Sequence, residues 1–191
     1  MNRSKFIILG LCLAIVLSGC TTTQSGKTTY DPEARTTIVT GKETTIAPMM
    51  GAVRTIFLKA EISTGETGLY LVVLYLSVDG WLSADEIWDS SGTRLVGLRG
   101  SNETLPIQFG QVTKEIYYIP LTRRYLQAHR NSGIDIYLKG ANGTLTATQP
   151  SGFVNGFLAD LDETETRLHG EVIVKELVPT IAKPTERSGS R

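Results

Sequence analysis

The sequence predicts an α+β domain that consists mostly of antiparallel β-sheet, arranged like a sandwich, with one or two short helices. Segments rich in β-branched and aromatic residues recur along the chain between turn signals such as Asn142-Gly143. Only two segments, 123–131 and 153–161, have apolar residues at the spacing of an amphipathic helix. We therefore expect strands to form most of a single globular domain over residues 51–180.

The first two strands of this domain are expected at residues 53–62 and 69–76. The second segment is continuously apolar and contains the β-branched pair Val72-Val73. A buried helix would also be apolar throughout, but the β-branched and aromatic content and the turn signal that follows favour a strand. A strand that is apolar on both faces is usually covered on both faces, so 69–76 should lie at the centre of the sheet.

The next region allows two interpretations. Ser83 and Glu86 have the spacing of a helix capping box, whereas the Asp-Ser-Ser-Gly stretch at 89–92 is typical of the turn in a β-hairpin. We favour the hairpin, with strands at 82–88 and 93–98.

Two helices and five further strands complete the expected domain. Thr122 is suited to cap a short helix over 123–131, and Gly133 is suited to end it in a left-handed conformation. A second amphipathic helix is expected over 153–161. The remaining strands are expected at 107–112, 115–119, 134–139, 144–148 and 172–178.

The first twenty residues have the order of a secretory signal peptide. Two basic residues, Arg3 and Lys5, precede a twelve-residue apolar run at 6–17, and small residues follow it. At about 1.5 Å per residue this run extends roughly 18 Å as a helix, whereas the hydrocarbon core of a bilayer is about 30 Å thick. We therefore expect an export signal and not a membrane span.

The stretch Leu17-Ser18-Gly19-Cys20 resembles the lipobox of bacterial lipoproteins, which reads Leu, a small residue, Gly or Ala, and Cys. The resemblance implies removal of residues 1–19 and attachment of lipid to the sulfur of Cys20. In Gram-negative relatives an Asp after the cysteine favours the inner membrane, so Thr21 implies the outer membrane, facing the periplasm. An ordinary secreted protein with an incidental cysteine is the alternative.

The segments on either side of the domain are poor in large apolar side chains. Residues 20–50 are rich in Thr, so we expect a flexible tether between the lipid and the domain. Within this tether, 36–40 and 44–46 have strand-like content and are candidates for an edge strand. Residues 181–191 are polar and are predicted to form a flexible tail.

Composition limits the biochemical role of the mature chain. Cys12 lies in the expected signal and Cys20 is assigned to lipid, so no disulfide and no thiolate ligand for a metal is expected. The 172 residues that remain, 191 minus 19, suffice for one buried core. Loss of Arg3 and Lys5 leaves 17 basic and 19 acidic residues, a formal charge of −2, which gives no electrostatic reason for nucleic-acid binding.

No motif in the sequence assembles a catalytic or cofactor site. The chain lacks a Gly-x-Ser-x-Gly nucleophile elbow, a phosphate-binding Gly-rich loop and the Cys or His pairs of a zinc site. The two histidines, His129 and His169, are expected on the first helix and in a loop. We therefore predict no enzymatic activity and no cofactor or metal.

Three groups of residues are candidate sites, and each also has an ordinary structural explanation. The acidic residues within 160–165 lack the glycine of a calcium loop and are expected at the solvated end of the second helix. The candidate basic patch around the first helix is otherwise a solvated face. The two tryptophans are candidate partner contacts, with core packing as the alternative. The residues of the last two groups are Arg123, Arg124, Arg130, Trp81 and Trp88.

These features predict a lipid-anchored protein of the cell envelope that acts as a non-catalytic binding or scaffolding module. An apparatus for secretion or surface assembly is the expected setting, by analogy of location. The alternative is a lipid-anchored hydrolase or carbohydrate-binding protein whose site is assembled from distant residues. The expected partners are the membrane, through the lipid on Cys20, and another envelope protein.

Overall fold

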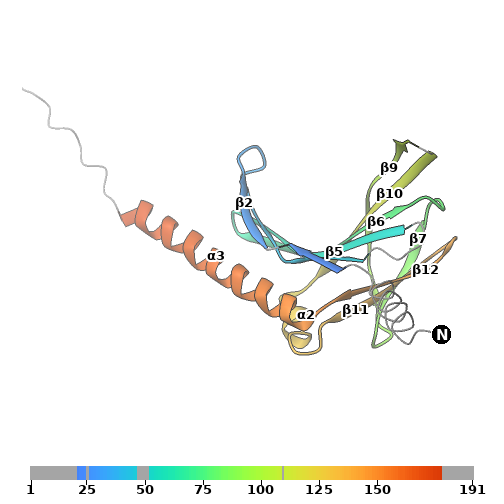
Figure 1. Ribbon diagram of the computed structural model, residues 1–191. Coiled ribbons are helices and arrows are strands. Elements are labelled where there is room, and N and C mark those ends of the chain that lie inside the picture. The colour runs from blue at the N-terminus through green and yellow to red at the C-terminus, as the bar shows by residue number, and fades with distance from the viewer. Residues whose placement is uncertain (1–20, 25, 47–51, 109, 178–191) are drawn as a thin grey trace, which may run out of the picture.

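The computed structural model describes residues 21–24, 26–46, 52–108 and 110–177, which fold into two antiparallel β-sheets and two helices (Figure 1). Sheet A has eight strands and sheet B has four. This arrangement confirms the predicted class, an α+β fold that is mostly antiparallel sheet. In Figure 1, sheet B and the long helix α3 (Ser151–Leu177) lie on the same side of sheet A.

The spatial order of the strands differs from their order in the sequence. Sheet A has the path β1 (Thr21–Gln24), β4 (Glu43–Ile46), β5 (Ala52–Ser63), β6 (Glu66–Ser77), β10 (Gly110–Leu121) and β9 (Leu98–Ile107), and β5 also pairs with β3 (Thr36–Thr40), which pairs with β2 (Lys27–Asp31). Sheet B has the order β12 (Gly143–Gln149), β11 (Ile134–Gly140), β7 (Ala84–Asp89) and β8 (Arg94–Leu95). The short helix α2 (Arg123–Ala128) connects β10 to β11.

The core lies between the facing sides of the two sheets and the first half of α3. Side chains alternate along each strand, so Ile56, Leu58 and Ala60 of β5 all point inward and are fully buried. Phe157 and Leu161 of α3 reach the same cluster. Burial of each large apolar side chain stabilises the fold by about 1.5–3 kcal/mol, and this core holds the two sheets together.

β6 lies at the centre of sheet A, between β5 and β10, as its sequence predicts. The expected cover on both faces is not found among the described elements, because sheet B and α3 lie on one side only. Leu71 and Val73 point into the core and are fully buried. Leu74 and Leu76 alternate with inward-facing side chains, point to the opposite face and are half-buried.

The segment 20–50, predicted as a flexible tether, contains four strands in its described part. β1 pairs with β4, and both β3 and β4 pair with β5. Val39 is fully buried in the core, and Thr37 and Thr44 are also buried. Threonine is β-branched and packs well on a pleated surface, so a segment with few large apolar residues still joins the sheet. The candidate edge segments 36–40 and 44–46 correspond to β3 and β4.

Three predictions in the second half of the chain are wrong. The expected strand at 107–112 spans the turn between β9 and β10. The expected strand at 172–178 is helical through Leu177, because α3 continues past Gly170, and His169 therefore lies on a helix and not in a loop. Each added helical residue gains one hydrogen bond, so a helix that is held by packing of its first half extends into a segment of high β propensity.

The β7–β8 hairpin and the first helix agree with the sequence. β7 pairs antiparallel with β8, which confirms the hairpin interpretation. Thr122 caps α2 by accepting a hydrogen bond from the N–H of Tyr125 at 3.1 Å. The helix ends at Ala128, before its predicted end, and Gly133 follows with a φ of +82°. A side chain at that left-handed position would also meet the Gln149 carbonyl oxygen, so glycine suits it on both counts.

Candidate functional site

Cys20, the predicted lipid-attachment residue, lies outside the described residues. The next residue, Thr21, is the first of β1 and pairs with Ile46 of β4. In the part of the chain that the structure describes, no helix has both the length and the hydropathy needed to cross a bilayer. The chain therefore enters the described domain through the β1 edge of sheet A.

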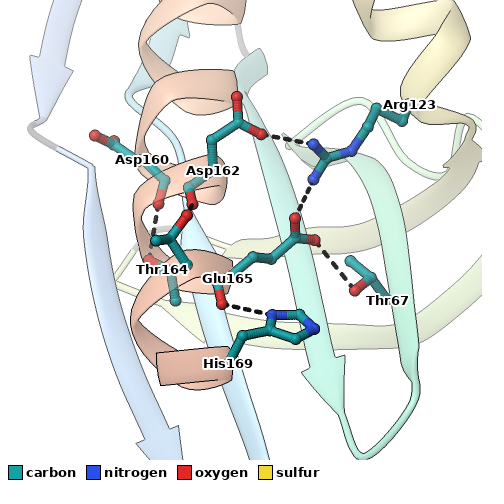
Figure 2. A network of polar contacts seen from close by, with 8 residues as sticks. Thr67, Arg123, Asp160, Asp162, Thr164, Glu165 and His169 are labelled. Carbon is teal, nitrogen blue, oxygen red and sulfur yellow. Dashed lines mark hydrogen bonds and ion pairs between the residues drawn. The ribbon is translucent and has the colours of Figure 1, made fainter. Parts of the chain in front are cut away.

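Arg123 connects α2 to α3 (Figure 2). Its guanidinium pairs with Asp162 at 2.6 Å and with Glu165 at 2.5 Å, and Glu165 also accepts a hydrogen bond from Thr67 of β6 at 3.3 Å. Desolvation lowers the pKa of Arg123, but the hydrogen bonds and charges of the two carboxylates outweigh it and raise the pKa overall. These acidic residues were expected at a solvated helix end, and instead two of them hold α3 against α2 and β6.

The three arginines of the candidate basic patch differ in their surroundings. The charge of Arg123 is compensated by its two carboxylates, whereas Arg124 and Arg130 are exposed. The carbonyl oxygen of Arg130 accepts a hydrogen bond from Asn155 of α3 at 2.8 Å, which ties the end of α2 to α3. Arg123, through its side chain, and Arg130, through its backbone carbonyl, therefore contribute to the contact with α3.

Trp81 and Trp88 are half-buried, and neither belongs to the buried core. Trp88 pairs with Tyr137 in the register of β7 and β11, and the guanidinium of Arg94 lies 5.8 Å from the centre of its ring. Trp81 precedes β7, and its carbonyl oxygen accepts a hydrogen bond from Asn142 at 2.6 Å. Both tryptophans therefore lie outside the buried core cluster, and a role as partner contacts stays a prediction.

Neither histidine is paired with a nucleophile. His129 stacks on Tyr125 with ring centres 4.1 Å apart, and its Nδ1 lies 2.9 Å from the Tyr125 carbonyl oxygen. His169 is exposed on α3, with Nδ1 2.7 Å from the Glu165 carbonyl oxygen (Figure 2). A general base must reach the proton it removes, and both rings are instead bonded to the backbone of their own helix.

Glu115 of β10 is a fully buried carboxylate. It accepts hydrogen bonds from the N–H of Leu82, from the N–H of Ser83 at 3.0 Å and from the hydroxyl of Tyr117 at 2.5 Å. Leu82 and Ser83 belong to the connection that carries the chain from sheet A to sheet B, and Ser83 has a φ of +51°. A buried carboxylate is tolerated only when donors satisfy its oxygens, so Glu115 and this connection stabilise each other.

Tyr117 and Gly140 complete the same joint. The Tyr117 hydroxyl accepts a hydrogen bond from the N–H of Ala84 at 2.9 Å, and burial together with the hydrogen bond to Glu115 raises the pKa of Tyr117 to about 12. A Cβ atom at Gly140 would overlap the carbonyl oxygen of Leu82. We call the group Leu82, Ser83, Glu115, Tyr117 and Gly140 the crossover clamp. Its polar groups are buried and engaged with one another, which is typical of a structural role.

A second buried carboxylate, Asp89, organises the turn of the β7–β8 hairpin. Its Oδ1 accepts hydrogen bonds from the N–H groups of Ser91 at 2.9 Å and Thr93 at 2.8 Å, and Tyr125 of α2 donates to Oδ2 at 3.3 Å. Burial raises the pKa of Asp89, but these hydrogen bonds outweigh it and hold the pKa below its ordinary value. Burial and the charge of Asp89 together raise the pKa of Tyr125 to about 12.

Two shallow clefts lie along α3. One, of about 170 Å³, is shared with β2 and is lined by Lys27, Asp160, Glu163 and Arg167 among others. The other, an open groove of about 600 Å³, includes His169 and the carboxylates that pair with Arg123. Ligand pockets are usually lined by apolar and aromatic side chains, and neither cleft has a large one. Within the described ranges, no three His, Cys, Asp or Glu side chains converge to hold a metal ion.

The outward surfaces of the two sheets differ in composition. On sheet B, Thr144, Thr146 and Thr148 of β12 are all exposed. On sheet A, most outward side chains at the middle of the three central strands are large and apolar, although Thr55 lies among them, and they are neighbours in the strand register. We call this set the outer face; it comprises Val53, Phe57, Val72, Leu74, Leu76, Ile116 and Tyr118.

Apolar side chains dominate the outer face, but Thr55 lies between Val53 and Phe57, and the Lys59 ammonium lies 5.7 Å from the centre of the Tyr118 ring. Val72 is buried by its neighbours, and the other members are half-buried. The ion pairs Lys59–Glu61, at 2.6 Å, and Lys114–Glu103, at 3.3 Å, lie at two of its margins. Contiguous apolar surface with a polar rim is typical of a site where another molecule binds. The outer face is therefore the candidate functional site of the described domain.

Comparisons of this chain with protein-family models, with curated proteins and with solved structures find no match. The geometry of the chain itself is accordingly the basis for interpreting the site.

Sequence reasoning missed both the crossover clamp and the outer face, although each leaves a signal. Glu115 is separated from Tyr117 and Ile119 by even numbers of residues along the strand, so its side chain lies on the same face as theirs. A charged residue therefore occupies an inward position of an alternating strand. The outer face appears as apolar residues at the alternate, outward positions, such as Leu74 and Ile116, and the strand that contains Leu74 is the one predicted to be covered on both faces.

Proposed function

We propose that the protein is a lipid-anchored component of the bacterial cell envelope that acts as a non-catalytic binding or scaffolding module for another envelope protein. The anchor is the lipid that the Leu17–Cys20 stretch, which resembles a lipobox, would receive on Cys20. The proposed location is the outer membrane, facing the periplasm, and the proposed setting is an apparatus for secretion or surface assembly.

The observation that carries the proposal is the outer face of sheet A. When a strand is apolar on both faces and one face stays in water, burial of that face would stabilise the protein by about 25 cal/mol for each Å² of apolar surface removed from water. Outward threonines on sheet B show that the same fold also builds a polar exterior. A partner that offers a complementary apolar surface would bury the outer face, with the ion pairs at its margins left at the rim of the interface.

Site-specific photo-crosslinking in intact cells tests this proposal. A photoreactive residue at Leu74 or Ile116, in the outer face, is expected to give one adduct of discrete mass. The matched control is the same residue at Thr146, on the outward surface of sheet B, which is expected to give none. Equal adduct patterns at the three positions, or no adduct at the first two, would contradict the proposal.

The anchor has its own test, which is independent of any partner. Cys20→Ser is expected to abolish incorporation of labelled palmitate and to leave the protein soluble or unprocessed. Cys12→Ser is the matched control, because Cys12 lies in the expected signal and its loss should leave lipid labelling unchanged. Palmitate incorporation that persists in Cys20→Ser would exclude this anchor.

A further inference from the structure

One row of paired residues crosses sheet A from its first strand to its last. The register pairs Thr21 at the start of β1 with Ile46, and each partner pairs in turn with a residue of the next strand. Paired residues lie side by side, so this row runs across the sheet from strand to strand, and the strands twist relative to one another along it. The row is Thr21, Ile46, Arg54, Tyr75, Glu115 and Asn102.

Three exposed apolar side chains lie beyond this row, on the side from which the chain enters at Thr21. Val78 follows the end of β6 and is 53% exposed. Leu105 and Ile107 lie near the tip of the β9–β10 hairpin and are 38% and 47% exposed. We call these three residues the anchor end. In Figure 1 the β9–β10 tip projects from the body, and α3 extends away on the other side of the molecule.

Covalent geometry places the lipid-bearing residue next to the start of this row. Consecutive Cα atoms are about 3.8 Å apart, so Cys20 lies within one residue of the row that starts at Thr21. At about 3.4 Å for each strand residue, Ile107, which is five residues past Asn102, lies roughly 17 Å from the row along β9. Because neighbouring strands twist relative to one another, its reach toward the bilayer is shorter than this length. A domain lipidated at Cys20 thus presents the hairpin tip to the same bilayer.

We propose that the anchor end rests on the lipid surface and that Val78, Leu105 and Ile107 insert at the boundary of headgroups and acyl chains. This inference rests on the proposed function, because it requires the lipid on Cys20. It gives the domain one orientation: the strands of sheet A run toward the bilayer, and α3 points away from it. The lipid and the inserted side chains then form two separate attachments, and two signals hold a protein at a membrane far more stably than one.

The charges near the anchor end indicate which lipids it fits. Lys114 pairs with Glu103, and on sheet B Lys139 pairs with Glu86 at 3.3 Å, so these basic side chains are compensated. Asp79, next to Val78, is exposed. Attraction to an anionic bilayer needs clustered, uncompensated Lys and Arg. Insertion is therefore expected to depend on apolar contact and to be as strong on neutral phosphatidylcholine as on anionic phosphatidylglycerol.

Single fluorescent probes on the full-length lipidated protein test the orientation. The mature chain has no thiol other than Cys20, whose sulfur carries the lipid, so Ile107→Cys and Val78→Cys each accept one environment-sensitive dye. Val96→Cys is the matched control, because Val96 is 72% exposed but lies before the opposite end of β9. The proteins are reconstituted in phosphatidylcholine vesicles that contain nitroxide-labelled acyl chains, and mass spectrometry verifies the lipid on Cys20.

The expected result is a blue shift and loss of most of the emission at positions 107 and 78, with no change at 96. In the double variant Leu105→Asn, Ile107→Asn, the probe at position 78 is expected to return toward its emission in water. An equal response at 107 and 96 in lipidated protein overturns this inference and leaves the proposed anchor intact. Quenching between dyes on two copies of the protein, in vesicles without nitroxide, would also overturn this inference, because it would show that the two anchor ends contact each other, and it too would leave the proposed anchor intact. A chain with no lipid on Cys20 overturns both proposals.

Discussion

Two polar joints in the described structure use similar chemical groups in different surroundings. In the crossover clamp, Glu115 is fully buried and its partners are backbone N–H groups and a phenol. In the joint between α2 and α3, the Arg123 side chain is 37% exposed and that of Asp162 is 62% exposed. The clamp lies in the row of sheet A that begins at Thr21, whereas Arg123 follows the other end of β10.

The difference in burial decides what each joint contributes. If a buried acceptor is removed, its donors cannot recover a bond from water, and each orphaned group costs about 1–3 kcal/mol. When an exposed ion pair is broken, water replaces the partner, so the measured loss is about 0–1 kcal/mol. The short ion-pair distances at Arg123 therefore contribute less than the buried hydrogen bonds of Glu115.

Glu115→Ala is expected to produce the largest effect. The substitution orphans the N–H groups of Leu82 and Ser83 and the hydroxyl of Tyr117, so the free energy of unfolding should fall by about 3–5 kcal/mol. Urea denaturation followed by circular dichroism measures this. Glu103→Ala, which removes an exposed carboxylate on the neighbouring strand, is the control and should change the free energy by less than about 1 kcal/mol. Equal losses in the two variants would contradict the role assigned to burial.

Tyr117→Phe is expected to cost less, about 1–3 kcal/mol, because it leaves the backbone donors of Glu115 in place. It should also change the response to alkali. The pKa of Tyr117 rises from 10.0 to about 12 on folding, so its contribution is complete below pH 10 and is lost as the pH rises through 12. Unfolding measured between pH 8 and pH 12 should show a shallower decline in the variant, and parallel curves would count against the pKa shift.

Asp89→Asn is expected to lower the free energy of unfolding by about 1 kcal/mol at pH 7, since the amide keeps an acceptor oxygen but weakens bonds made to a charge. The pKa of Asp89 lies below 3.8 in the folded protein, so its contribution is present above pH 3.8 and disappears as the pH falls through the lower folded value. The difference in the free energy of unfolding between wild type and variant should therefore become smaller as the pH falls below 3.8. A gap that widens below pH 3.8 would reverse the sign of this shift.

Arg123→Gln is expected to have the smallest effect, below about 1 kcal/mol, because the pair is partly exposed. Salt screens exposed charges, so 1 M NaCl should remove most of the difference from wild type. Arg124→Gln, on the same helix but exposed, is the control and should be neutral. Thermal unfolding at low and high salt distinguishes the two variants. A large loss of stability in Arg123→Gln that does not change with salt would show that this ion pair behaves like the buried hydrogen bonds of Glu115, against the comparison drawn above.

Local pattern was enough to predict the strands that build the centre of the fold. β5, β6 and β11 fall on segments with β-branched, alternating or continuous apolar residues. The turn signalled by Asn142-Gly143 joins β11 to β12, with Ala141 and Asn142 in the turn and Gly143 as the first residue of β12. These features depend on residues close together in the sequence. The hairpin at Asp89 was predicted from the same kind of signal, and its carboxylate makes the turn hydrogen bonds that such residues favour.

Pairing between distant segments could not be predicted in the same way. The Thr-rich strands β3 and β4 exist because β5 offers them an edge, and α3 extends to Leu177 because Phe157 and Leu161 anchor its first half in the core. The crossover clamp depends on residues 33 positions apart, Leu82 and Glu115. The position of Glu115 in the alternating pattern shows that its side chain faces inward, but it does not show which groups donate hydrogen bonds to it. Cys20 and its lipid stay a prediction.

The start of β1 immediately after Cys20 has a consequence for how a partner would be found. If the domain is lipidated and rests on its anchor end as proposed, it keeps one tilt while it diffuses laterally in one leaflet and rotates about the membrane normal. The strands of sheet A would stand upright on the bilayer, and the outer face would look sideways, parallel to the membrane plane. Its search for a partner would then be two-dimensional, among neighbours at the same height above the membrane.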